Sequence, residues 1–170
     1  MTYLIGSLRN PEIPAIAAQL REGLNDEVFA SWWCASDDAD DTWERYEKGR
    51  GLTYKQALQD YAAQNVLRFD KTHLLRCDRA VLVAPFGKSG CIELGFVLGR
   101  EKEAYVVLNG EPEGRWDVML GLATGVFYSV EELITAISLT EEIRSCREQM
   151  VALKNRTIPV KWFDADGPSI

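Results

Sequence analysis

The chain has 170 residues, of which 46% are hydrophobic and 26% are charged, and its formal net charge is -7 at pH 7. This length fits one domain with a sizeable core, and the composition excludes disordered and fibrous proteins. Proteins that hold a nucleic-acid polymer usually present a basic face, so the acidic balance disfavours such a partner. A small anionic ligand is still compatible with it, provided that local donors hold the ligand.

No apolar run approaches the roughly 20 residues that span a bilayer, and the first ten residues lack the basic segment of a signal peptide. The four cysteines are scattered without a CxxC pair, and the chain has one histidine, His73. That spacing fits neither a disulfide framework nor a zinc site. We therefore expect a cytoplasmic protein with no membrane partner and no metal.

Strand and helix patterns alternate from the start of the chain. Thr2–Ile5 predicts a first strand, and Pro11 and Pro14 suit the opening of a helix. Val28–Trp33, rich in β-branched and aromatic residues, predicts a second strand. The apolar face of the intervening helix is formed by residues at helical spacing, namely Ile13, Ile16, Leu20 and Leu24.

An acidic loop is expected over Ser36–Asp41, followed by a helical pattern over Thr42–Leu75 that is broken near Gly49 and Gly51. The predicted core stripe of this region consists of Leu58, Tyr61, Ala62 and Val66.

The clearest buried strand is Arg79–Ala84, a continuous apolar run of the kind found in central parallel strands. A glycine-containing turn over Pro85–Gly90 leads into a helix that is expected to start near Ile92. Ala104–Leu108 predicts the next strand, and Asn109–Glu113 a polar loop.

Val126–Tyr128 predicts a last short strand. Ser129 and Glu132 form a capping-box pattern ahead of one helix, and Ser138 and Glu141 repeat it for a final helix. The alternation predicts a single α/β domain with a parallel sheet of about five strands covered on both faces. No structure is assigned to the tail, residues 157–170.

Ligands of open parallel sheets bind beyond the carboxyl ends of the strands. After the first strand, the backbone at Gly6 and Ser7 together with Arg9 could form a nest for a phosphate, although a simple strand-ending turn explains the same residues. Ser89 and Gly90 offer further amide donors at a helix N-terminus. Neither glycine segment has the spacing of an ATP or NAD fingerprint, so no cofactor is predicted.

Glu93 is expected in the first turn of the helix near Ile92, where the helix dipole would keep its carboxylate ionised. That placement has a purely structural explanation, but a carboxylate at this edge also suits glycosyl transfer, whose transition state resembles an oxocarbenium cation. Asp70 is the natural second carboxylate, unless it simply pairs with Lys71 or Arg76.

Other candidates rank lower. Of the adjacent Trp32 and Trp33, one is expected in the core and the other, Trp33, could stack on a base. His73 is more typical of a surface or capped helix position than of a catalyst, and Cys91 lacks a neighbouring histidine base. A solvated loop explains the acidic cluster, which lacks the spacing of a calcium loop and comprises Asp37, Asp38, Asp40 and Asp41.

Taken together, two blocks resemble the nucleoside 2-deoxyribosyltransferase superfamily, especially its 2'-deoxynucleoside 5'-phosphate N-hydrolase branch. The first is the segment Tyr3-Leu4-Ile5-Gly6-Ser7-Leu8-Arg9. The second runs from Asp70 through the apolar strand to Ser89-Gly90-Cys91-Ile92-Glu93-Leu94-Gly95. The segment from Trp32 to Thr53 has no counterpart in either branch and is interpreted as an insert.

The resemblance implies a flavodoxin-like, Rossmann-like three-layer sandwich, no metal, and a homo-oligomer. It implies Glu93 as nucleophile, Asp70 as the assisting aspartate, Tyr3 as an aromatic near the sugar, and Ser7 and Arg9 on the phosphate side. The expected ligand is a small nucleoside or nucleotide. The leading hypothesis is N-glycosidic cleavage of a (deoxy)nucleoside 5'-monophosphate to a free base and a sugar phosphate. A base-exchanging transferase and a non-catalytic nucleotide-binding module are the alternatives.

Overall fold

The computed structural model describes residues 1–114 and 116–156, so the tail predicted from Thr157 onward lies outside the described residues. The backbone divides into two units, Met1–Thr135 and Ala136–Ile170, which are treated separately below. In the described part of the chain, no helix is both long enough and apolar enough to cross a membrane.

The first unit is built on a five-stranded sheet in the order β2-β1-β3-β4-β5, and every pair of neighbouring strands is parallel. This is the strand order of flavodoxin-like folds, so the predicted α/β three-layer architecture is confirmed. The strands are β1 (Thr2–Ile5), β2 (Val28–Phe29), β3 (Arg79–Val83), β4 (Glu103–Val107) and β5 (Gly125–Phe127).

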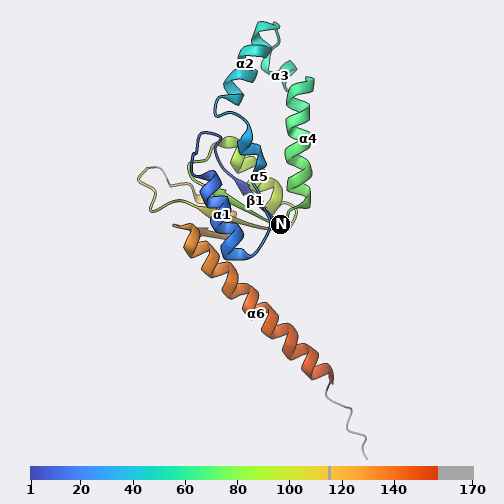
Figure 1. Ribbon diagram of the computed structural model, residues 1–170, viewed down its shortest axis with the longest axis vertical. Helices are drawn as coiled ribbons and strands as arrows, with labels where there is room; N and C mark the ends of the chain where they lie inside the picture. Colours follow the sequence, from blue (N-terminus) through green and yellow to red (C-terminus); the bar gives the residue numbers. More distant parts are fainter. Residues whose placement is uncertain (115, 157–170) are drawn as a thin grey trace, which may run out of the picture. The chain divides into compact units, whose positions relative to one another are not determined.

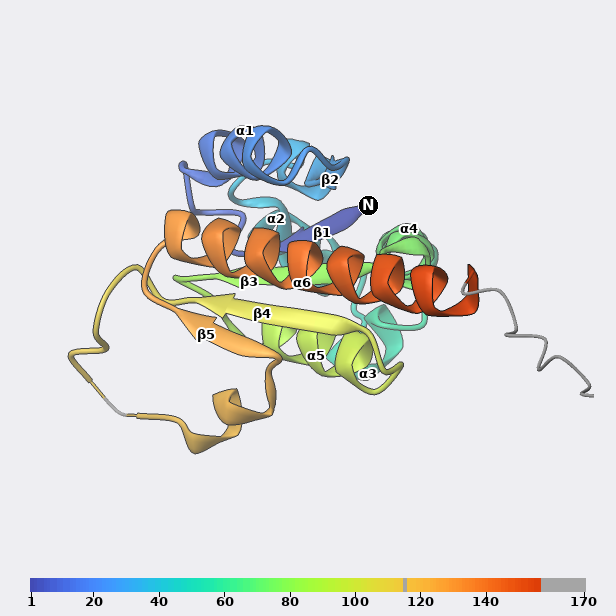
Figure 2. The same cartoon turned by 90° about the horizontal axis from the view of Figure 1, so that it is seen from below.

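Helices cover both faces of this sheet (Figures 1 and 2). On one face α4 and α5 lie against the core, and on the other lie α1 and the first turn of α6. The helices are α1 (Ile13–Leu24), α2 (Ala39–Gly49), α3 (Tyr54–Ala57), α4 (Tyr61–Arg76), α5 (Lys88–Leu98) and α6 (Val130–Arg156). Two short 3-10 helices, η1 (Ser31–Cys34) and η2 (Val118–Leu122), lie in the connections.

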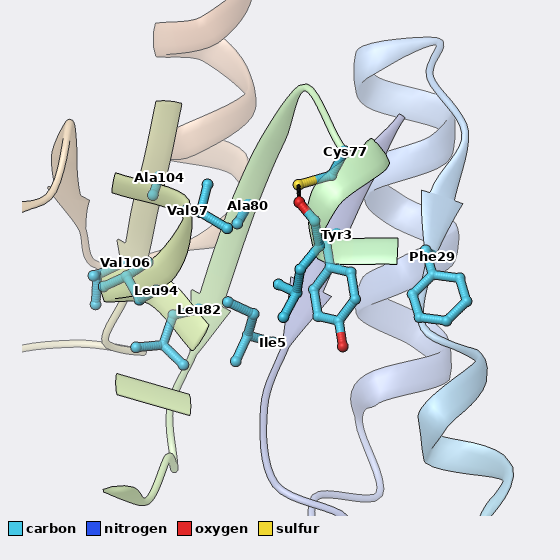
Figure 3. Close-up of a cluster of buried hydrophobic side chains, with 11 residues drawn as sticks. Tyr3, Ile5, Phe29, Cys77, Ala80, Leu82, Leu94, Val97, Ala104 and Val106 are labelled. Carbon is cyan, nitrogen blue, oxygen red and sulfur yellow. Dashed lines mark hydrogen bonds between the residues drawn. The ribbon is translucent and has the colours of Figure 1, made fainter. Parts of the chain in front are cut away.

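The core beneath α4 and α5 follows from the alternation of side chains along the strands (Figure 3). Tyr3 is in register with Ala80, and Ile5 with Leu82, so these four side chains share one face. Residues of the opposite parity are also buried, because a parallel sheet covered by helices has no solvated face. A polar group on these strands therefore needs a partner inside the protein.

Several element boundaries differ from the predictions. The second strand is only Val28–Phe29, because the chain turns into η1, where the indole N–H groups of Trp32 and Trp33 donate to backbone carbonyls. The acidic loop is shorter than expected: α2 begins at Ala39, and Asp40 and Asp41 occupy its first turn, which the helix dipole favours.

The predicted core stripe along residues 58–66 is wrong. Tyr61 is 78% exposed and Val66 is 61% exposed, and α4 contacts the core near its carboxyl end, through Leu74. The first half of α4 extends past the sheet beside α2 and α3 (Figure 1). The predicted break before Ser138 is also wrong, because α6 runs without interruption from Val130 to Arg156.

Two glycines of α5 provide a matched test of how closely this helix packs against the sheet. A Cβ atom on Gly90 would lie 2.9 Å from Cδ1 of Leu82 and 3.2 Å from Cγ2 of Ile5, whereas a Cβ on Gly95 would have no atom within 4 Å. Gly90→Ala should therefore lower the free energy of unfolding by about 1–3 kcal/mol through overpacking. Gly95→Ala should raise it by about 0.5–1 kcal/mol through helix propensity. Urea denaturation measures both, and equal effects of the two substitutions would contradict the packing.

Candidate functional site

The loops that follow β1, β3 and β4 meet at the carbonyl oxygen of Ala84. This oxygen accepts a hydrogen bond from Nδ2 of Asn109 at 3.1 Å and a long one from Nδ2 of Asn10 at 3.5 Å. Asn10 is 4% exposed, and its Oδ1 also accepts from the backbone N–H of Glu12 ahead of α1. The edge at which α/β sheets bind ligands is thus held together by side chains from adjacent loops.

The loop after β1 contains the predicted phosphate-side residues. Ser7 Oγ accepts a hydrogen bond from the backbone N–H of Arg9 at 3.2 Å, which fixes a tight turn. The Arg9 guanidinium pairs with Asp41 of α2 at 2.9 Å, and both side chains are more than half exposed. A Cβ atom on Gly6 would lie 2.7 Å from Cδ1 of Ile13, so a larger residue there would displace that side chain.

The predicted turn after β3 is shorter than expected, because α5 begins at Lys88 and not near Ile92. Ser89 and Gly90 therefore lie in the first turn of α5, where backbone amides have no acceptor within the helix. Ser89 is exposed, whereas Gly90 is buried against the sheet.

The two tryptophans are both anchored to the loop at the end of β1. Trp32 donates its indole N–H to the carbonyl of Leu4 at 2.7 Å and packs against the core. Trp33 donates to the carbonyl of Asn10 at 2.9 Å and is half-buried. The start of the predicted insert is thereby attached to the loop that carries Ser7 and Arg9.

Tyr3, Asp70 and Glu93 come together from β1, α4 and α5. Tyr3 is 1% exposed, and its phenol lies close enough to the carboxyl group of Asp70 for each group to affect the pKa of the other. Its hydroxyl points toward the Ile5 end of β1, which is the carboxyl end (Figure 3). Glu93 is half-buried and close enough to both groups for their charges to interact. The Oδ1 atom of Asp70 is buried and has no hydrogen-bond partner among the described residues.

This environment raises the pKa of all three groups. Burial, reinforced by the charge of Asp70, raises the pKa of Glu93 to about 7. Burial also raises the pKa of Asp70, against the opposing effects of the nearby His73 and of the Tyr3 phenol. The pKa of Tyr3 lies far above its ordinary value because of burial and the two nearby carboxylates. The predicted placement of Glu93 in the first turn is wrong, because Glu93 lies in the second turn of α5, where desolvation outweighs the effect of the helix dipole on its pKa.

Aromatic side chains surround the Asp70 side of this cluster. His73 stacks on Phe29 with ring centroids 3.7 Å apart, and its Nδ1 lies 2.9 Å from the carbonyl oxygen of Phe69. Phe29 in turn contacts the ring of Tyr3 at 5.2 Å. His73 is thereby oriented by packing, and its charged form would stabilise an ionised Asp70.

Two carboxyl groups in such an environment, influencing each other's charge, can divide the roles of nucleophile and proton carrier. No group of three or more acidic, histidine or cysteine side chains that could hold a metal ion occurs among the residues that the structure describes. Cys91 is exposed on α5, and Cys77 is buried, with its thiol donating to the carbonyl of Leu74.

Sequence reasoning missed Asn10 and Asn109. Their common partner, the carbonyl of Ala84, lies 74 and 25 residues away along the chain, so no local pattern marks the contact. A weak signal existed in each case. Asn10 stands directly before Pro11, shortly ahead of α1, and Asn109 follows a strand in the left-handed conformation that asparagine tolerates, with φ 57°.

No protein-family profile and no curated protein sequence matches this chain. Among solved structures, the CMP N-glycosidase BcmB of Clostridium botulinum is similar, with a TM-score of 0.47 and 13% sequence identity. The match covers 82% of this chain and 99% of that protein.

The raised pKa of Glu93 predicts a pH-dependent cost to stability. A carboxyl group whose pKa rises from 4.5 when unfolded to about 7 when folded stabilises the fold only while protonated, and this contribution is lost as the pH rises between those values. Glu93→Gln should therefore raise the free energy of unfolding at pH 8 by up to about 3 kcal/mol, with little effect at pH 4.5. Urea denaturation at both values checks this. The exposed control Glu148→Gln should show no such difference. An equal effect of Glu93→Gln at both pH values would contradict the desolvation of Glu93.

Proposed function

We propose that the protein cleaves the N-glycosidic bond of a (deoxy)nucleoside 5'-monophosphate, releasing the free base and the sugar phosphate. The observation that carries this proposal is the cluster in which Glu93 and Asp70, both desolvated, lie close enough to each other and to the phenol of Tyr3 for their charges to interact. Glycosidic cleavage needs one carboxylate at the anomeric carbon and a second group that moves a proton. This cluster supplies both without a metal or cofactor.

In the first step, the Glu93 carboxylate attacks the anomeric carbon, and the bond from that carbon to the base nitrogen breaks. The electron pair leaves with the base, and a glycosyl ester of Glu93 forms. Burial raises the pKa of both carboxyl groups, and the charge of Asp70 raises that of Glu93 further. Near neutral pH the pair therefore favours the state that holds one proton. When Glu93 is the ionised partner, Asp70 carries the proton that the leaving base takes.

In the second step, a water molecule attacks the same carbon while Asp70 removes one of its protons. The ester bond to Glu93 breaks, the sugar phosphate is released, and both carboxyl groups return to their initial states. Tyr3, beside Asp70, would help to position that carboxyl group and would not transfer a proton itself, because its pKa is far too high.

The phosphate would bind at the loop after β1. Ser7 and the backbone at Gly6 form its turn, Arg9 supplies the charge, and the first-turn amides of α5 at Ser89 and Gly90 lie after the neighbouring strand. Trp33, held on the same loop by Asn10, is the aromatic surface proposed for the base.

The principal test of the nucleophile uses Glu93→Gln, which keeps the shape of the side chain and removes its charge. We expect release of free base to fall on the order of 1000-fold or more, while nucleotide binding persists. Intact-mass measurement with a slow 2'-fluoro substrate analogue should show a covalent adduct on the wild-type protein and none on the variant. For the wild type, kcat/KM should fall as the pH rises through about 7, because the carboxyl pair then loses the proton that the leaving base takes.

Near-normal turnover of Glu93→Gln would remove the nucleophile assignment. Incubation of the wild-type protein with a panel of nucleosides and nucleotides then distinguishes the remaining alternatives. Free base released without an acceptor indicates a hydrolase, base exchange that requires an acceptor indicates a transferase, and binding without turnover indicates a nucleotide-binding module.

Substitutions of the two partners of one ion pair, Arg9 and Asp41, test the proposed phosphate site. Arg9→Ala should weaken binding of a nucleoside 5'-monophosphate by roughly 10- to 150-fold and leave binding of the nucleoside unchanged, since a charge-assisted hydrogen bond is lost. Asp41→Asn frees Arg9 from its exposed pair and should tighten monophosphate binding by up to about 5-fold. Isothermal titration measures both. Equal losses for both ligand classes in Arg9→Ala would assign Arg9 a structural role.

A further inference from the structure

Beyond Ala136, helix α6 carries a row of exposed apolar side chains. Leu139 is 56% exposed, Ile143 49%, Met150 56% and Leu153 64%, and Cys146 is also exposed. A helix with this much apolar surface in water lowers its free energy by covering it. We call these five residues the α6 seam.

The spacing within the α6 seam is four, three, four and three residues. This is the heptad alternation that keeps side chains on one stripe of a helix and lets two helices supercoil around each other. In heptad notation Ile143 and Met150 occupy a positions, and Leu139, Cys146 and Leu153 occupy d positions. A β-branched residue at a combined with leucine at d favours two parallel strands.

We infer that the α6 seam pairs with the same seam of a second copy of this chain, forming a parallel two-stranded coiled coil. This inference is independent of the proposed function, because it uses no residue of the Glu93 cluster. The covering partner is a second copy because the seam combines a dimer-type core with charges that complement those of an identical helix.

Those charges also select the direction of the pair. In a parallel coiled coil, a g residue of one helix faces the e residue five positions later in the other. Here these residues are Glu142 and Arg147, both exposed, so two symmetric attractive pairs would flank the seam. In an antiparallel pair that aligns Ile143 with Cys146, Glu142 would face Gln149 and Arg147 would face Thr140, which gives no ion pair.

The first experiment measures the oligomeric state of the full chain by sedimentation over a range of concentrations. The wild-type protein should be a dimer, and Ile143→Lys should be a monomer with an unchanged circular dichroism spectrum of the remaining fold, since Ile143 is half exposed. Glu148→Lys, at an outward f position, is the matched control and should stay dimeric. A wild-type monomer, or an Ile143→Lys dimer, would overturn the inference.

The second experiment tests the direction through charge reversal. Glu142→Arg and Arg147→Glu should each weaken the dimer by roughly 2- to 30-fold, the range expected for two exposed ion pairs. The double variant should recover most of the wild-type dissociation constant, which a loss of helix stability alone would not allow. If the two substitutions together weaken the dimer by as much as their separate effects combined, the parallel pairing is refuted.

The third experiment uses the cysteine at the centre of the seam. In a parallel pair Cys146 faces its own copy, so mild oxidation should give a disulfide-linked dimer. The link should be lost in Cys146→Ser but kept in Cys34→Ser and Cys91→Ser, whose thiols are also exposed. Moving the thiol by one residue, in the double variant Ser145→Cys with Cys146→Ser, should abolish efficient linkage. A dimer that does not link through Cys146 would contradict the parallel direction.

Discussion

The buried phenol of Tyr3 and the carboxyl group of Asp70 lie close together where the sheet meets α4, at the candidate site. Tyr3 belongs to a strand whose two faces are both covered, so its phenol cannot reach bulk water and needs an acceptor inside the protein. Asp70 offers a carboxyl group nearby, but at the cost of bringing that group out of water. Among the described residues, its Oδ1 atom has no hydrogen-bond partner, and the neighbouring carboxyl group is that of Glu93.

Such an arrangement works against stability. Two carboxyl groups that are desolvated and repel each other favour the unfolded chain at neutral pH, and apolar side chains would fill the same space at lower cost. Natural proteins keep local conflicts of this kind mainly where function needs them. That conflict is the strongest reason to regard the cluster as a catalytic site and not as a buried structural network.

The sequence predicted the sheet well, because strands buried on both faces are continuous apolar runs such as Arg79–Val83. Such runs can be recognised without knowing which strands lie beside them. It failed where a position is set by tertiary contact. The helical spacing of Tyr61 and Val66 predicted burial, yet in the structure this part of α4 is exposed. The start of α5 at Lys88 was missed because a glycine and a lysine carry little local signal. Asp70 was grouped with Glu93 because glycosyl transfer suits a second carboxylate, and the family resemblance supported the same pair.

The short segment from Gly90 to Glu93 shows how packing and chemistry are connected in this fold. Without a Cβ atom, Gly90 lets α5 approach the side chains of Leu82 and Ile5 more closely than any other residue would. Glu93 follows three residues later, which places it on nearly the same face of the helix. The depth at which its carboxyl group sits beside Tyr3 is therefore set by the contact at Gly90. Desolvation of Glu93, and with it the shift of its pKa toward neutrality, is thus a consequence of how closely one helix rests on the sheet.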